Sequence, residues 1–139
     1  MKRGMLLNSE ISYVISKLGH TDTLTIGDCG LPVPDGVQRI DLAVVKGLPE
    51  FMPVLQAILE EQEIEKVILA EEIKSANPVL LHEILSFIER TGVKEGKTID
   101  VEYVPHEEFK KKTRDSKAVV RTGEYKAYAN IILVSSVTF

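Results

Sequence analysis

The sequence predicts an α/β fold of three layers, in which helices flank a central and largely parallel sheet. Short β-branched segments alternate with longer segments in which apolar residues recur every three or four positions, as in folds with parallel strands. Two strand segments, residues 66–70 (KVILA) and 131–134 (IILV), are continuous apolar runs, which is typical of strands covered on both faces. The 139 residues contain no repeat or linker, so we expect one domain over residues 1–139.

The first predicted helix covers residues 9–18. One face of it is apolar, with residues spaced at i, i+3, i+4 and i+7: Ile11, Val14, Ile15 and Leu18. Asn8 or Ser9 is the candidate N-cap, because a short side-chain oxygen can accept a free backbone N–H. Gly19 follows the last apolar position and is expected to end the helix in the left-handed conformation, which places His20 just beyond it.

Residues 23–26 and 39–45 are the first two predicted strands, because both are rich in β-branched and aliphatic residues. Glycine and proline recur in residues 27–36 between them, and this composition predicts a loop. Pro49 suits the first turn of a second helix, where its missing N–H has no cost. The apolar face of that helix has five members: Phe51, Val54, Leu55, Ile58 and Leu59.

The second half of the chain continues the alternation with a strand at residues 66–70. Asn77 and Pro78 are expected to be the N-cap and first residue of a long helix that ends at Gly92. The remaining predicted elements are strands at residues 98–104, 118–121 and 131–137 and a short polar helix at residues 106–112.

The composition excludes several classes of function. The formal net charge is −4, so the chain lacks the basic surface of a general nucleic-acid binder. The apolar runs are too short to cross a bilayer, and no partner in a membrane is expected. Cys29 is the only cysteine, which indicates a reducing cytoplasm rather than a disulfide-bonded protein. No metal-ligand spacing and no glycine-rich phosphate loop is present, so neither a metal nor a nucleotide cofactor is expected.

Two of the three histidines are candidate catalytic residues. His82 falls on the polar face of its predicted helix and is interpreted as a solvated side chain. His20 and His106 lie at the ends of elements, where loops on a rigid scaffold often carry chemistry. His20 and Asp28 flank one strand and could converge. A nucleophilic pair of Cys29 with His20 is an alternative, although a small, partly buried cysteine is favoured.

The binding candidates lie beside strand ends. Asp28 follows the first strand, where the ligand crevice of a parallel sheet is expected. Tyr128 and Asn130 supply a phenol and an amide before the last strand, and such neutral groups suit an uncharged, hydroxylated ligand. These residues lie at the opposite edge from Asp28 in a parallel sheet. One subunit therefore brings them together only if the last strand is antiparallel.

Three motifs resemble those of the D-ribose pyranase family, to which the fucose mutarotases are related. They are L-G-H-T-D at residues 18–22, D-C-G-L-P-V-P at residues 28–34 and Y-A-N-I-I-L at residues 128–133. The resemblance covers the whole chain. Cys29 stands where such proteins can have alanine, and this departure argues against a cysteine mechanism.

The resemblance implies both an activity and a set of site residues. His20 would be the proton donor, and the sugar would be bound by Asp28, His106 and the segment Tyr128, Ala129 and Asn130. The implied reaction interconverts β-D-ribopyranose and β-D-ribofuranose in ribose utilisation, without a cofactor or metal. Family members are cytoplasmic homo-oligomers, typically decamers, with sites near subunit contacts. The alternatives are a mutarotase of fucose or another sugar and a non-catalytic sugar-binding or regulatory protein.

Overall fold

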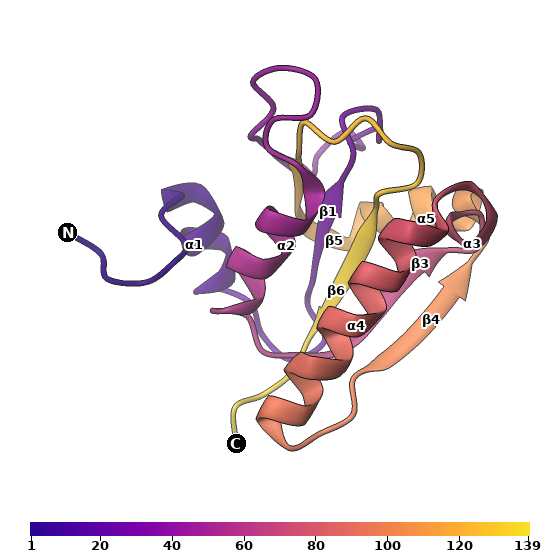
Figure 1. The fold of residues 1–139 in the computed structure, drawn as a ribbon. Coiled ribbons are helices and arrows are strands. Elements are labelled where there is room, and N and C mark those ends of the chain that lie inside the picture. Colours follow the sequence, from indigo (N-terminus) through magenta and orange to yellow (C-terminus); the bar gives the residue numbers. More distant parts are fainter.

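A six-stranded sheet forms the centre of the computed structural model, which describes residues 1–139 (Figure 1). Its strands are β1 (Thr23–Gly27), β2 (Gln38–Asp41), β3 (Ile64–Ala70), β4 (Asp100–Val104), β5 (Ser116–Arg121) and β6 (Ile131–Ser135). Their spatial order is β2-β5-β1-β6-β3-β4. Every neighbouring pair is parallel except the two pairs that β6 makes, because β6 runs antiparallel to β1 and β3. The predicted, largely parallel sheet is therefore confirmed.

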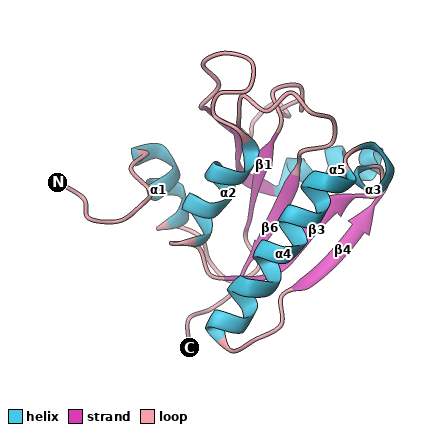
Figure 2. Ribbon diagram, viewed as in Figure 1, coloured by secondary structure: helices cyan, strands magenta, loops and turns pink.

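Helices cover both faces of this sheet, which confirms the three layers (Figure 2). The helices are α1 (Ser9–Ile15), α2 (Phe51–Leu59), α3 (Ile73–Ala76), α4 (Pro78–Glu95) and α5 (His106–Lys112), followed by a 3-10 turn at Thr113–Asp115. α1, α2 and α4 enclose a core of 24 buried residues on one face. α5 and the loop after β1 enclose 6 buried residues on the other. None of the helices combines the length and apolar composition that a bilayer crossing requires.

In β6, the continuous apolar run predicted as a strand has both of its faces buried. Ile131 and Leu133 point into the larger core, whereas Ile132 and Val134 point into the smaller one. Each such side chain contributes about 1.5–3 kcal/mol when it is fully buried. A polar residue at any of these four positions would therefore weaken the packing of one helix layer against the sheet.

The end of α1 differs from the prediction. The helix begins as expected, with the side chain of Asn8 accepting a hydrogen bond from the Ile11 N–H, but it ends at Ile15. Gly19 does not adopt the left-handed conformation; Thr21 does, with a φ of 66°. The Gly19 N–H donates instead to the carboxylate of Asp22 at 2.8 Å. This side-chain contact closes a separate turn, on which His20 lies.

The prediction that Gly92 ends the long helix is also wrong. α4 passes through Gly92 and ends at Gly96, which has a φ of 70°. Gly92 is buried, and a Cβ there would lie 2.6 Å from the Lys97 carbonyl oxygen. A glycine is needed here because the chain after α4 passes too close to this position for a side chain. Pro78 is the first helical residue as predicted, whereas the side chain of Asn77 makes no cap bond and donates to the Ala127 carbonyl.

Two further differences concern the edges of elements. β2 ends at Asp41, and the residues predicted to extend it form a loop in which Val45 and Leu48 make an isolated bridge. Pro49 lies in this loop, before the Glu50 N-cap of α2, and not within the helix. The five apolar residues predicted for α2 are nevertheless all buried. α3 has no counterpart in the prediction because its four residues are too short to show a helical period.

Candidate functional site

The antiparallel direction of β6 brings the predicted binding residues to one edge of the sheet. Asp28 directly follows β1, and Asn130 directly precedes β6. The Asp28 N–H donates a hydrogen bond to the Asn130 side-chain oxygen at 2.9 Å. One chain therefore joins the two segments that a fully parallel sheet would have separated.

Asp28 is a partly desolvated carboxylate at the start of the loop that follows β1. Its Oδ1 accepts a hydrogen bond from the Gly30 N–H at 2.9 Å. Burial raises the pKa of the Asp28 carboxyl, while hydrogen bonds from Gly30, Asn130 and Leu31 and the charge of His106 act against this rise. A carboxylate in such surroundings is suited to accept hydrogen bonds from the hydroxyl groups of a ligand.

His106 lies beside Asp28 as the first residue of α5. Its ring meets the Tyr128 ring edge-on, with 5.0 Å between the centroids. The backbone N–H of His106 donates to the carboxylate of Glu72, at 2.9 Å and 3.1 Å to its two oxygens. The Nδ1 atom of His106 is buried and has no hydrogen-bond partner. An unpaired buried nitrogen beside a carboxylate and a phenol is the feature expected where a polar ligand completes the hydrogen bonding.

The segment before β6 is held in a tight turn. Tyr128 has a φ of 58°, which is uncommon for a residue with a side chain, and the Asn130 N–H donates to the Tyr128 carbonyl at 2.9 Å. Asn130 is 1% exposed and Ala129 is 0% exposed. The side chain of Ala129 belongs to the core, so of this residue only the backbone is available to a ligand.

The strand β5 and the residues after it anchor the loop that contains Asp28. The Thr122 hydroxyl donates to the Gly27 carbonyl at 2.8 Å, and the Cys29 N–H donates to the Glu124 carbonyl at 2.7 Å. The Arg121 Nε donates to the Cys29 carbonyl at 3.1 Å. Cys29 thus contributes its backbone to the loop, and its partial burial agrees with the interpretation of a small residue rather than a nucleophile.

Two residues that were not predicted as site residues, Glu72 and Arg121, support the site from outside. Glu72 fixes the start of α5 through the His106 N–H, and Arg121 pairs with Asp41 on the neighbouring strand as it holds the Cys29 carbonyl. Each contact joins residues at least 34 positions apart, so local periodicity does not reveal it. The available signal was the presence of charged residues at the ends of otherwise apolar segments.

His20 lies at the opposite edge of the sheet from this cluster. It precedes β1, whereas Asp28 follows it, and a strand of five residues spans roughly 16 Å at about 3.3 Å per residue. The expectation that His20 and Asp28 converge is therefore wrong within one chain, and the same separation excludes a pair of His20 with Cys29. The contact that His20 does make is with Glu65, whose Oε2 is 3.0 Å from its Nε2.

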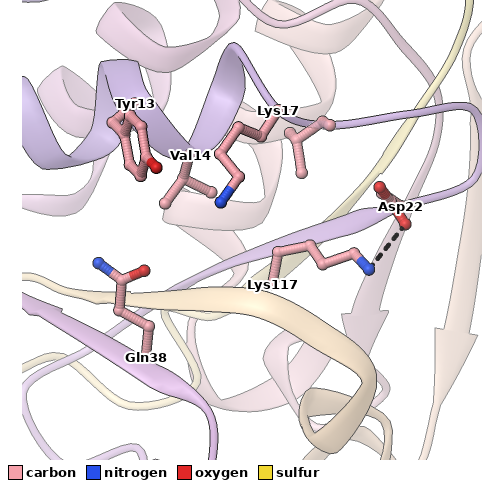
Figure 3. A pocket seen from close by; sticks show the side chains of 7 residues that line it. Tyr13, Val14, Lys17, Asp22, Gln38 and Lys117 are labelled. Atoms are coloured by element: carbon pink, nitrogen blue, oxygen red, sulfur yellow. Dashed lines mark ion pairs between the residues drawn. The ribbon is translucent and has the colours of Figure 1, made fainter.

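A cavity of about 270 Å³ adjoins the turn that contains His20 (Figure 3). It is lined by Tyr13, Val14, Lys17, Leu18, Asp22, Gln38 and Lys117. Asp22 and Lys117 form an ion pair at 3.2 Å in its lining, and the hydrogen bond from Gly19 lowers the pKa of the Asp22 carboxyl. The cavity contains none of the predicted site residues, and its charged Asp22 serves to close the His20 turn.

His82 and the basic run of α5, which the sequence presents as solvated side chains, are on the surface. His82 is exposed on α4, as predicted. Lys110 and Lys111 pair with glutamates one turn earlier on α5, so the basic run is a solvated helix face. The chain contains no group of three or more His, Cys, Asp or Glu side chains arranged to hold a metal ion.

Comparisons with known proteins give a consistent result. A model of the RbsD / FucU transport protein family matches residues 1–138. D-ribose pyranases of Proteus mirabilis (strain HI4320) and Aliivibrio fischeri (strain MJ11) are 55% and 53% identical over 139 residues, which is 100% of each chain. The structure of Bacillus subtilis RbsD complexed with D-ribose is 46% identical, with a TM-score of 0.85 and 100% coverage of both chains. A fucose mutarotase from Streptococcus pneumoniae in complex with L-fucose shares the fold, with a TM-score of 0.80 at 21% identity.

Proposed function

Because the chain belongs to the RbsD / FucU transport protein family, we propose that it interconverts the pyranose and furanose forms of D-ribose. The observation that carries this proposal is the full-length likeness to D-ribose pyranases. The cluster at the carboxyl edge of the sheet supports it. This cluster offers a carboxylate, a phenol, an amide and an imidazole, which together suit a neutral sugar better than a phosphate ester.

In this proposal the cluster binds the sugar and His20 provides the proton. The hydroxyl groups of ribose are bound by Asp28, His106, Tyr128, the backbone of Ala129 and Asn130. Histidine suits the second role because its side chain both gives and takes protons near neutral pH. General acid–base help of this kind is typically worth about 10²–10⁴-fold, which is sufficient for a ring opening that also proceeds slowly in water.

The reaction is a ring opening followed by a different ring closure. A proton is added to the ring oxygen as its bond to the anomeric carbon breaks, and a proton leaves the anomeric hydroxyl as the aldehyde forms. The open chain then rotates in the site. A different hydroxyl attacks the aldehyde, losing its proton while the carbonyl oxygen gains one. Protons are conserved over the two steps, and no electrons are transferred to another molecule.

We also propose that the protein is a homo-oligomer, with a decamer as the expected form. Its expected location is the cytoplasm. The support for the oligomer is the separation of His20 from the sugar-binding cluster by the length of β1. A neighbouring copy that presents its His20 turn to the cluster would complete the site. The small, acidic chain with its single cysteine is compatible with a reducing cytoplasm.

Saturation-transfer NMR on D-ribose tests the activity directly. We expect the protein to transfer saturation between the pyranose and furanose signals, because both forms share the open-chain intermediate. Transfer only between the α and β pyranose signals would indicate an anomer-specific mutarotase. No acceleration of any exchange would indicate a sugar-binding protein without catalysis. L-fucose is the second sugar to test, since the shared fold includes a fucose mutarotase.

Replacement of Asp28 by asparagine is expected to separate binding from stability. The change removes the charge that accepts hydrogen bonds from the sugar, and we expect ribose binding to weaken about tenfold or more. Because burial raises the pKa of the Asp28 carboxyl, its charged form costs stability at neutral pH. The variant should therefore be at least as stable as the wild-type protein at neutral pH. This difference should shrink as the pH falls through the raised pKa toward the ordinary carboxyl range.

Binding can be measured by isothermal titration with ribose, and stability by thermal unfolding at several pH values. Asp35→Asn is the matched control, because Asp35 is an exposed carboxylate in the same loop. Unchanged ribose affinity in the Asp28 variant would contradict its proposed role. A stability difference that grows as the pH falls would contradict the direction of the pKa shift.

A further inference from the structure

The His20 turn and the beginning of β3 meet at the end of β6. The Thr21 N–H donates to the Ser135 carbonyl at 3.0 Å, and the Ser135 N–H donates to the Asp22 carbonyl at 2.9 Å. On its other side, Ser135 is paired with Ile64, the first residue of β3. One residue of β6 therefore fixes the position of both segments relative to each other.

A strand irregularity directs Glu65 toward this junction. The register between β3 and β6 shifts between Ile64 and Lys66, so Glu65 is an extra residue in the strand. The burial pattern agrees, because Ile64 and Val67 both lie in the larger core although strict alternation would place them on opposite faces. Bulges of this kind change the direction of a side chain and are frequent beside active sites. Here the result is a distance of 3.0 Å between the Glu65 Oε2 and the His20 Nε2.

The ion pair contributes little to folding. The side chains of His20 and Glu65 are 54% and 42% exposed, and exposed pairs contribute about 0–1 kcal/mol. Glu65 is nevertheless the one hydrogen-bond partner that the chain provides to the His20 ring. The bulge at Glu65 and the two backbone hydrogen bonds of Ser135 place the Glu65 carboxylate beside His20. Because the contact adds little stability, we infer that its effect is on the orientation of the His20 ring.

We propose that Glu65 is a positioning residue for His20, an inference that rests on the proposed function. The carboxylate accepts a hydrogen bond from Nε2–H, which leaves Nδ1 as the nitrogen that exchanges a proton with the sugar. When His20 is protonated, Nδ1–H donates its proton to the ring oxygen, and the hydrogen bond from Nε2–H to Glu65 fixes the direction in which Nδ1 points. A carboxylate that orients a histidine in this way selects the tautomer as well as the direction of the ring.

The test is a double-mutant cycle between Glu65 and His20, measured by the rate of pyranose–furanose exchange. We expect Glu65→Ala to lower kcat by about 10- to 100-fold and to leave KM for ribose within about twofold. Glu65→Gln keeps a neutral acceptor and should lose less. In a His20→Ala background, Glu65→Ala should have no further effect, because its role requires the imidazole. Glu102→Ala is the matched control, since it removes a similar exposed ion pair, with Lys66, from the neighbouring strand.

Two results would overturn the inference while leaving the proposed function intact. One is a Glu65→Ala protein that keeps wild-type kcat; the other is an equal loss of activity in the presence and absence of His20. Nitrogen NMR of the imidazole rings adds a readout that does not depend on activity. We expect the Nε2–H form of His20 in the wild-type protein and a mixture of tautomers in Glu65→Ala. A wild-type protein with no ribose exchange would refute the proposed function, and an unchanged tautomer pattern would refute the positioning by Glu65.

Discussion

Replacement of His20 by alanine is expected to lower the rate of pyranose–furanose exchange by about 100-fold or more. The reason is that the variant loses the group proposed to protonate the ring oxygen. Ribose binding should largely remain, because the residues of the cluster lie at the other edge of the sheet. Saturation transfer measures the rate, and titration with ribose measures binding.

The same variant should fold normally. The His20 side chain is 54% exposed, and changes at exposed positions usually alter stability by less than about 0.5 kcal/mol. His82→Ala is the control, because it removes an exposed histidine from α4 without affecting the proposed site. If the His20 variant exchanged ribose at the wild-type rate, the proposed mechanism would be wrong. Thermal unfolding shows whether a loss of activity reflects a loss of structure.

Mixed oligomers of two inactive chains are expected to regain activity. One chain has His20→Ala, and the other combines Asp28→Asn with His106→Ala. If His20 serves the cluster of a neighbouring copy, co-expression in equal amounts brings a native cluster and a native His20 together at roughly a quarter of all sites. The mixture should then exchange ribose many times faster than either variant alone, because each parent contributes the half that the other lacks.

Light scattering after size-exclusion chromatography should show that the mixed and wild-type proteins are large oligomers. The two parent proteins, purified separately and mixed without subunit exchange, provide the control. Mixed oligomers without any regained activity would show that His20 does not act across a subunit contact. A wild-type monomer with full activity would lead to the same conclusion.

The sheet could be predicted because its apolar runs are buried on both faces. The segments KVILA and IILV are strands, and five of the six strands are parallel to one another, as expected. The direction of β6 could not be predicted, because a strand with both faces buried has the same apolar pattern in either direction. That direction decides which polar residues meet, so the sequence left the relation of Asp28 to Asn130 open.

The predicted site residues fall into two groups for a related reason. Asp28, His106, Tyr128 and Asn130 come together in one chain. Strand ends and turn residues mark each of them as a candidate from sequence alone, but their convergence depends on the direction of β6. His20 is separated from them, and its partner Glu65 lies 45 positions away at an irregularity of β3. Neither a bulge nor a contact over such a separation has a local signal, because both depend on how distant strands pair.

The position of β6 has a consequence for the order of events during protein synthesis. β6 leaves the ribosome after the other five strands of this sheet, yet it lies between β1 and β3 in its middle. Until residues 131–135 emerge, the nascent chain holds two unjoined halves, β2-β5-β1 and β3-β4, each with an open edge that could aggregate. Translation that stops shortly before Ile131 should therefore yield an insoluble or degraded product rather than a slightly shortened protein. The emergence of β6 closes the sheet and sets Asn130 beside Asp28, so that the fold and the proposed sugar site form in a single step.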